Sequence, residues 1–222
     1  MAYFEALNEL YISAQKEGAA VHGLWDNLNY LGKLTPPRQR KPVKVVMMGT
    51  GTIIKACIVQ DPSIIIDYSN FFVGLDDLEE AYFLCGFLNA PAVTQTVRVI
   101  IDEGAAGSGR NIMKRPFSIR LPRYDVENEL HQEIVKMALN MERHARKILD
   151  RWITGEEEKL KLKDKGENSE LDAIFNKISL KKLALQNRIY KELGWDTKKS
   201  AITGEFAQLN QLIREVISRK GK

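Results

Sequence analysis

The sequence has few of the residues that build metal centres and disulfide-bonded folds. Among its 222 residues are two cysteines and three histidines. Cys57 and Cys85 each lie in an apolar run, which favours two small buried thiols in a reducing compartment. His22, His131 and His144 are scattered, and no cysteine or histidine residues have the spacing of metal ligands. The sequence therefore predicts no zinc site.

Long apolar runs are also absent. No stretch of about 18 apolar residues is present, so a membrane-spanning helix is disfavoured. The N-terminus has no basic segment followed by an apolar core, which disfavours an export signal. We expect a cytoplasmic protein with no membrane partner.

Two segments resemble catalytic motifs only in part. Gly49-Thr50-Gly51-Thr52 follows a predicted strand, but Ile54 stands where a dinucleotide-binding loop needs its third glycine, and a strand follows instead of a helix. A hairpin turn fits better. Thr35-Pro36-Pro37-Arg38 faintly resembles the signature with which amino-methyltransferases hold a flipped base. Thr35 lacks the carbonyl and Arg38 the aromatic ring, so a rigid proline turn is favoured.

Other arrangements of catalytic residues are missing. The sequence has no defensible Ser/His/Asp group and no Gly-x-x-x-x-Gly-Lys loop. The acidic run 76–80 suits the start of a helix better than an acid/base pair. We expect this chain to carry no catalytic site and no cofactor of its own.

A modest excess of positive charge is present, and it is concentrated in two segments. The net charge is +4. The acid-free segment 38–44 contains Arg38, Arg40, Lys41 and Lys44, and the acid-free segment 110–123 contains Arg110, Lys114, Arg115, Arg120 and Arg123. Cations on loops beside strands suit binding to the phosphate backbone of a nucleic acid. Each phosphate that they neutralise releases counterions and adds affinity that does not depend on base sequence. An ordinary solvated basic surface is the alternative.

Residue periodicity predicts an α+β chain. The first half should contain a helix over Ala2–Lys16, an irregular connector over Gly18–Pro42, and an antiparallel meander of strands at Lys44–Met48, Ile53–Val59, Ser63–Ile66 and Asn70–Val73. Two helices should follow, over Asp76–Leu88 and Pro91–Ile101, since Pro91 ends one helix and suits the first turn of another. Asn89 is a candidate cap at that junction.

The second half is predicted to be mainly helical. A mobile glycine-rich loop over Asp102–Asn111 precedes a strand at Phe117–Leu121. Beyond it the pattern predicts a long amphipathic helix from Asp125, as a potential cap, to about Trp152, a charged break at Glu156–Glu167, and helices over Ser169–Leu193 and Glu205–Arg219. The two long helices are expected to form an antiparallel pair.

Three segments in a fixed order resemble a known family. They are Ala81-Tyr82-Phe83-Leu84-Cys85-Gly86-Phe87-Leu88-Asn89-Ala90-Pro91, Gly107-Ser108-Gly109-Arg110-Asn111-Ile112 and Phe117-Ser118-Ile119-Arg120-Leu121-Pro122. The order is similar to that of the target-recognition domains of TaqI-type N6-adenine DNA methyltransferases and of type I restriction-modification specificity subunits. Ile189-Tyr190-Lys191-Glu192-Leu193-Gly194 also looks like the end of their helical part. Ala90 replaces the usual serine, and nothing upstream supplies the cofactor-binding methyltransferase domain.

The resemblance implies a sequence-specific reader of double-stranded DNA. It would position DNA for an S-adenosylmethionine-dependent methyltransferase domain or subunit outside this chain, and the chain is then a fragment or a stand-alone subunit. A small antiparallel-rich sheet with packed helices, residues 1–124, would form the recognition domain. Residues 125–222 would form a helical extension that docks the catalytic partner or a second copy of the chain; the alternative is that these helices complete the core. The candidate DNA contacts are Arg38, Gln39, Arg40, Lys41, Ser108, Arg110, Asn111, Lys114 and Arg115, with Gln39, Ser108 and Asn111 assigned to base edges.

Two other functions stay open from the sequence. One is a helical assembly protein that binds no nucleic acid. The other is a complete enzyme of unfamiliar type, using a pocket between sheet and helices.

Overall fold

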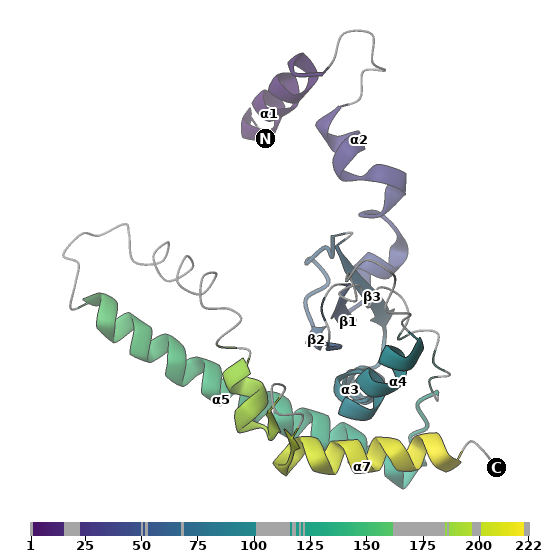
Figure 1. Cartoon of the computed structure of the whole chain (residues 1–222). Helices are drawn as coiled ribbons and strands as arrows, with labels where there is room; N and C mark the ends of the chain where they lie inside the picture. The colour runs from purple at the N-terminus through teal and green to yellow at the C-terminus, as the bar shows by residue number, and fades with distance from the viewer. Residues whose placement is uncertain are drawn as a thin grey trace.

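A computed structural model describes residues 2–15, 23–49, 51, 53–67, 69–100, 116, 119, 121, 123–161, 185, 187–196 and 201–219. These residues form helices and two small antiparallel sheets (Figure 1). The predicted mixture of helix and sheet is thereby confirmed. Within the described residues, no helix combines the length and apolar character needed to cross a membrane.

The larger sheet has its first strand in the middle. It contains β1 (Val43–Met48), β2 (Ala56–Val59) and β3 (Asn70–Leu75), all antiparallel in the order β2-β1-β3. The predicted meander is wrong, because a meander would place β2 in the centre. Instead β1 is in the centre and pairs along both of its edges. It is also the most buried strand, with Val45 and Met47 almost fully buried.

The predicted strand Ser63–Ile66 does not form. The Asp61 carboxylate accepts hydrogen bonds from the backbone amide and hydroxyl of Ser63, which turns the chain there. The same two bonds lower the pKa of Asp61. Further along, the backbone of Ile66 pairs with the side-chain amide of Gln39 and not with a strand.

Two helices follow the sheet as predicted, and the first of them packs on all three strands. α3 (Leu78–Asn89) begins at Asp77, whose carboxylate accepts from the Glu80 amide, and α4 (Pro91–Ile100) begins directly after Ala90. Two hydrogen bonds fix α4: the Thr94 hydroxyl accepts from the Ile54 amide, and Asn210 accepts from the Ala92 amide.

The long helix is longer than the sequence pattern indicates. α5 (Glu129–Lys161) continues through part of the predicted break at Glu156–Glu167. Asn128, not Asp125, accepts hydrogen bonds from the first free amides, those of Leu130 and His131. α7 (Gly204–Arg219) confirms the predicted last helix and packs on α5, where His144 and Glu205 lie 2.8 Å apart.

One hydrophobic core joins both halves of the chain. Val45 of β1, Phe83 of α3, Ile134 of α5 and Ile213 of α7 belong to the same buried cluster. A short hairpin of β4 (Trp195–Asp196) and β5 (Ala201–Ile202) precedes α7, and residues 187–192 are helical. The predicted strand Phe117–Leu121 has two described residues, Ile119 and Leu121, and neither lies in a strand. The loop Asp102–Asn111 and most of the helix Ser169–Leu193 lie outside the described residues.

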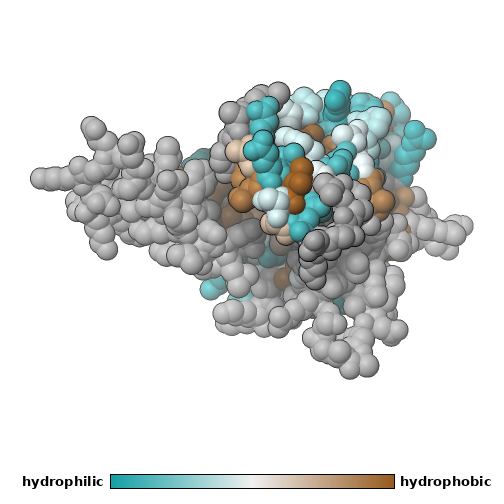
Figure 2. Space-filling model, turned by 90° about the horizontal axis from the view of Figure 1, so that it is seen from above, coloured by the Kyte–Doolittle hydropathy of each residue, from teal (hydrophilic) through white to brown (hydrophobic). Residues whose placement is uncertain are grey.

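The N-terminal part projects from this core. α1 (Ala2–Ser13), the predicted first helix, lies beside α2 (Leu24–Leu28) (Figure 1). The rings of Phe4 and Trp25 are in tilted contact, with their centroids 5.3 Å apart. The predicted irregular connector thus contains a short helix, followed by 3-10 turns η1 (Tyr30–Gly32) and η2 (Pro37–Arg40). Figure 2 views the molecule from the side of this arm and shows apolar side chains among hydrophilic ones.

Candidate nucleic-acid interface

The basic segment around η2 lies on the edge of the sheet. Strand β3 is an edge strand, and η2 packs against it. Arg38 and Arg40 are exposed on η2, and Lys41 follows directly. We call Arg38, Arg40 and Lys41 the basic edge. The structure therefore places three of the predicted contact residues together.

A buried glutamine holds this segment in place. Gln39 is only 1% exposed. Its Nε2 donates to the carbonyls of Ile66, at 2.7 Å, and Lys33, at 3.2 Å, and its Oε1 accepts from the Ile66 amide at 3.0 Å. The prediction that Gln39 contacts base edges is wrong, because both ends of its amide are used inside the protein. Gln39 instead fixes the backbone between two exposed arginines.

A glycine allows the close contact between η2 and β3. A Cβ atom at Gly74 would lie 2.5 Å from the Arg38 carbonyl oxygen and 2.8 Å from Cγ of Lys41. Both distances are shorter than van der Waals contact permits, so a larger residue would push η2 away from the sheet.

The cations of the basic edge differ in their partners. The Arg38 guanidinium lies over the ring of Phe72 on β3, 5.2 Å from its centroid, and this contact orients it. Lys41 forms an ion pair with Asp76. Arg40 is exposed and has no ion pair among the described residues. Arg38 and Arg40 are therefore the most available cations of the three.

The remaining predicted contacts have no described structure. Ser108, Arg110, Asn111, Lys114 and Arg115 all lie outside the described residues. Lys44, which belongs to the same basic stretch of sequence as Arg38, is fully buried in β1, and its ammonium donates to the Asp61 carbonyl at 3.0 Å. The two cations differ because Lys44 lies in the central strand of the sheet, whereas Arg38 lies on the exposed turn η2.

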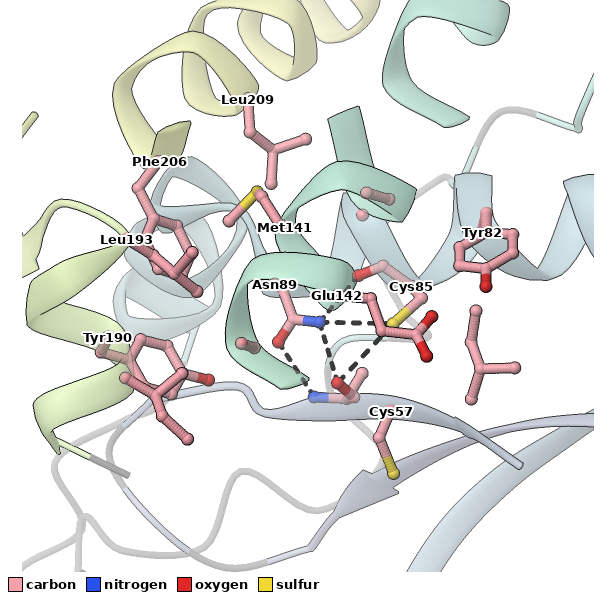
Figure 3. A pocket seen from close by; sticks show the side chains of 16 residues that line it. Cys57, Tyr82, Cys85, Asn89, Met141, Glu142, Tyr190, Leu193, Phe206 and Leu209 are labelled. Atoms are coloured by element: carbon pink, nitrogen blue, oxygen red, sulfur yellow. Dashed lines mark hydrogen bonds between the residues drawn. The ribbon is translucent and has the colours of Figure 1, made fainter. Parts of the chain in front are cut away.

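A second group of polar residues lies between β2 and α3, where sequence reasoning predicted only a helix cap. Asn89, the last residue of α3, does not cap the next helix. Its Oδ1 accepts from the Ala56 amide at 3.0 Å, and its Nδ2 donates to the carbonyls of Ala56 and Cys85 (Figure 3). The Asn89 amide thus pairs with the outer edge of β2 as a neighbouring strand would.

The two cysteines lie near this junction. Cys85 is half-buried, but Cys57 is exposed, so the prediction of two buried thiols is wrong for Cys57. Its strand neighbours Ala56 and Ile58 pack against the core, which turns the Cys57 side chain away from it. Desolvation, with a smaller effect of the neighbouring Cys57, raises the pKa of Cys85 to about 12.

No metal centre is formed by these groups. Within the described part of the chain, no three histidine, cysteine, aspartate or glutamate side chains come together to hold a metal ion. Comparison with known proteins gives no further guide: no family model, curated protein or solved structure matches the chain.

Proposed function

We propose that this chain is the sequence-specific DNA-recognition module of a restriction-modification N6-adenine methyltransferase. The observation that carries the proposal is the basic edge: Arg38 and Arg40 are exposed on either side of a clamped glutamine, at the edge of a sheet. The ordered motifs of segment 81–122, which resemble those of target-recognition domains, support the same function.

A rigid display of cations suits phosphate binding. Because Gln39 and Gly74 fix η2 on β3, the backbone that carries the two arginines is ordered before any DNA arrives, which lowers the entropy cost of binding. Contacts to phosphates position a duplex without reading it. Base reading is then the proposed task of Ser108 and Asn111, beside the cations Arg110, Lys114 and Arg115. Methyl transfer and S-adenosylmethionine binding are assigned to a catalytic domain or subunit outside this chain.

The decisive experiment measures duplex binding against salt concentration. A duplex selected from a random pool should bind at about 50 mM salt, with an affinity that falls steeply as salt rises. The double variant Arg38→Ala/Arg40→Ala should weaken binding and make the slope of log K against log salt shallower by about two, because each arginine is expected to neutralise one phosphate. Arg110→Ala/Lys114→Ala tests the second basic segment in the same way.

A matched control removes the same charge elsewhere. Lys136 and Lys147 are exposed on α5, so Lys136→Ala/Lys147→Ala lowers the net charge equally. This variant should leave the slope almost unchanged. Absence of duplex binding by the unaltered chain at low salt would refute the proposal. An equal slope change in Arg38→Ala/Arg40→Ala and in Lys136→Ala/Lys147→Ala would show that the basic edge does not contact the DNA.

A second function, assembly through the N-terminal arm, is favoured by one observation. Leu10, Trp25 and Leu31 are between 56% and 76% exposed on or beside α1 and α2. Exposed apolar side chains on a projecting helix pair suit burial against another protein. Sedimentation of the chain with Leu10→Ser and Trp25→Ser separates the two functions: a change in oligomeric state with DNA binding intact assigns the arm to assembly alone.

A further inference from the structure

A cavity lies where the sheet and α3 meet the later helices. Its volume is about 260 Å³. Five parts of the chain line it: β2, α3, α5, the segment 187–193 and α7 (Figure 3). The larger side chains in its walls are apolar or aromatic, and they include Met141, Tyr190, Leu193, Phe206 and Leu209. An occupant would therefore contact both halves of the chain.

The outer edge of β2 adjoins this cavity. In an antiparallel pair, alternate residues direct their backbone groups toward the neighbouring strand. Lys55 directs its carbonyl toward β1, where it accepts from the Met48 amide. The residues of β2 whose backbone N–H and C=O groups point away from β1 are therefore Ala56 and Ile58. Both residues line the cavity, as does Asn89, which bonds to this outer edge.

Side chains of the same chain cover the outer edge as far as Ala56. The Thr94 hydroxyl accepts from the Ile54 amide at 3.2 Å, and both backbone groups of Ala56 bond to Asn89. The next groups to point outward are the N–H and C=O of Ile58, and no described residue forms a hydrogen bond with either of them. Free backbone groups on a sheet edge pair readily with another extended chain.

The described polar side chains around the cavity offer it no net charge. Burial raises the pKa of the Cys85 thiol to about 12, so it stays protonated. Burial, together with the Glu142 carboxylate, raises the pKa of Tyr82 to about 12. The carboxylate of Glu142 is paired with the Arg146 guanidinium at 2.7 Å. An uncharged side chain is therefore the best occupant.

We propose that a partner protein adds an antiparallel extended segment to β2 at Ile58 and places an uncharged apolar side chain in the cavity. One residue of that segment would accept from the Ile58 N–H and donate to its C=O, as the Asn89 amide does at Ala56. Residues opposite each other in an antiparallel pair have side chains on the same face of the sheet. Ile58 packs on the core face, so the opposite residue directs its side chain into the cavity.

The volume of the cavity fits one large side chain. An apolar cavity of about 150 Å³ holds benzene, so this cavity of about 260 Å³ accepts the ring and the methylene group of phenylalanine. A second copy of β2 suits the site less well, because its own Ile58 already packs against its own core. The site is also separate from the basic edge, which lies at β3 on the opposite edge of the sheet.

The test uses a small compound with one complete residue, N-acetyl-L-phenylalanine N-methylamide. Saturation-transfer NMR and calorimetry on the full chain should detect saturable binding in the millimolar range. An analogue with an ester oxygen in place of the phenylalanine N–H should bind about tenfold more weakly, because the Ile58 carbonyl loses its donor. The glycine analogue, which leaves the cavity empty, should also bind at least about tenfold more weakly. No saturable binding, or equal affinity of either analogue, would overturn the proposal.

Variants assign the binding to Ile58 and the cavity. Ile58→Pro removes the outward N–H but no hydrogen bond to β1, and edge strands tolerate proline in that orientation. Ile58→Ala, the matched control, shortens the side chain and keeps the N–H. The proline variant should bind the phenylalanine compound about tenfold more weakly than the alanine variant. Ala145→Phe, on the α5 wall, should fill the cavity and abolish binding. Circular dichroism confirms the fold of each variant.

Two results would contradict the proposal. One is equal affinity of the two Ile58 variants, and the other is unchanged binding in a folded Ala145→Phe protein. Sedimentation with and without the phenylalanine compound tests the alternative occupant. Dissociation of a dimer by the compound would assign the edge to a second copy of this chain and overturn the role of a partner protein.

Discussion

Single amide side chains replace strand partners at two points of this fold. Asn89 pairs with the outer edge of β2, and Gln39 pairs with the extended backbone at Ile66. The sequence alone makes Asn89 a candidate helix cap and Gln39 a candidate DNA contact. Their partners lie 33 and 27 residues away in the chain, so no local pattern identifies them.

At the residue scale, Asn89→Ala should destabilise the chain by about 2 kcal/mol. The substitution leaves the amide and carbonyl of Ala56 without partners at a half-buried edge. Asn89→Asp should be at least as harmful, because its carboxylate would face the Ala56 and Cys85 carbonyls. Urea unfolding measures both effects. The exposed Asn140→Ala on α5 is the control, with an expected change within about 0.5 kcal/mol. A destabilisation of similar size in Asn140→Ala would contradict the proposed role of Asn89.

At the scale of elements, the position of η2 on β3 depends on Gly74. Gly74→Ala should cost about 1–3 kcal/mol, since its Cβ would overlap the Arg38 carbonyl. DNA affinity should fall as well, because the displaced η2 carries the basic edge. Gly155→Ala provides a control on α5, where a Cβ meets nothing within 4 Å. This change should stabilise the helix by up to about 1 kcal/mol. Equal stability of Gly74→Ala and the unaltered chain would show that η2 adjusts without cost.

The order of the strands is another element-scale result that sequence did not predict. Alternation and turn residues located β1, β2 and β3 to within three residues at either end. They do not determine which strand is central, because the central strand is selected by burial on both faces and pairing along both edges. The full burial of Lys44 follows from that central position.

At the scale of the whole molecule, the shared core predicts cooperative unfolding. Ile213 of α7 is fully buried in the cluster that contains Val45 of β1. Ile213→Ala should cost about 2–5 kcal/mol and reduce hydrogen-exchange protection of β1 amides as well as those of α7. Ile217→Ala, at an exposed position of the same helix, should change neither. Unchanged protection in β1 would indicate that residues 1–124 and 125–222 unfold separately.

The candidate sites were predictable to different degrees. Arg38, Arg40 and Lys41 stand together in sequence, so their clustering needs no tertiary contact. Ile58 gave a weaker signal, that of an apolar residue in a predicted strand. That pattern shows neither that β2 lies at the edge of the sheet nor that a cavity adjoins it.

The sequence by itself determined the features that depend on interactions between residues close together in the chain. The start of α3 follows from the Asp77 carboxylate, the break before α4 from Pro91, and the basic edge from adjacent cations. Tertiary structure alone decided the central place of β1, the burial of Gln39 and Lys44, the exposure of Cys57 and the cavity beside β2. These depend on which distant backbone groups and surfaces meet, and such pairings are selected by the free energy of the whole packed core.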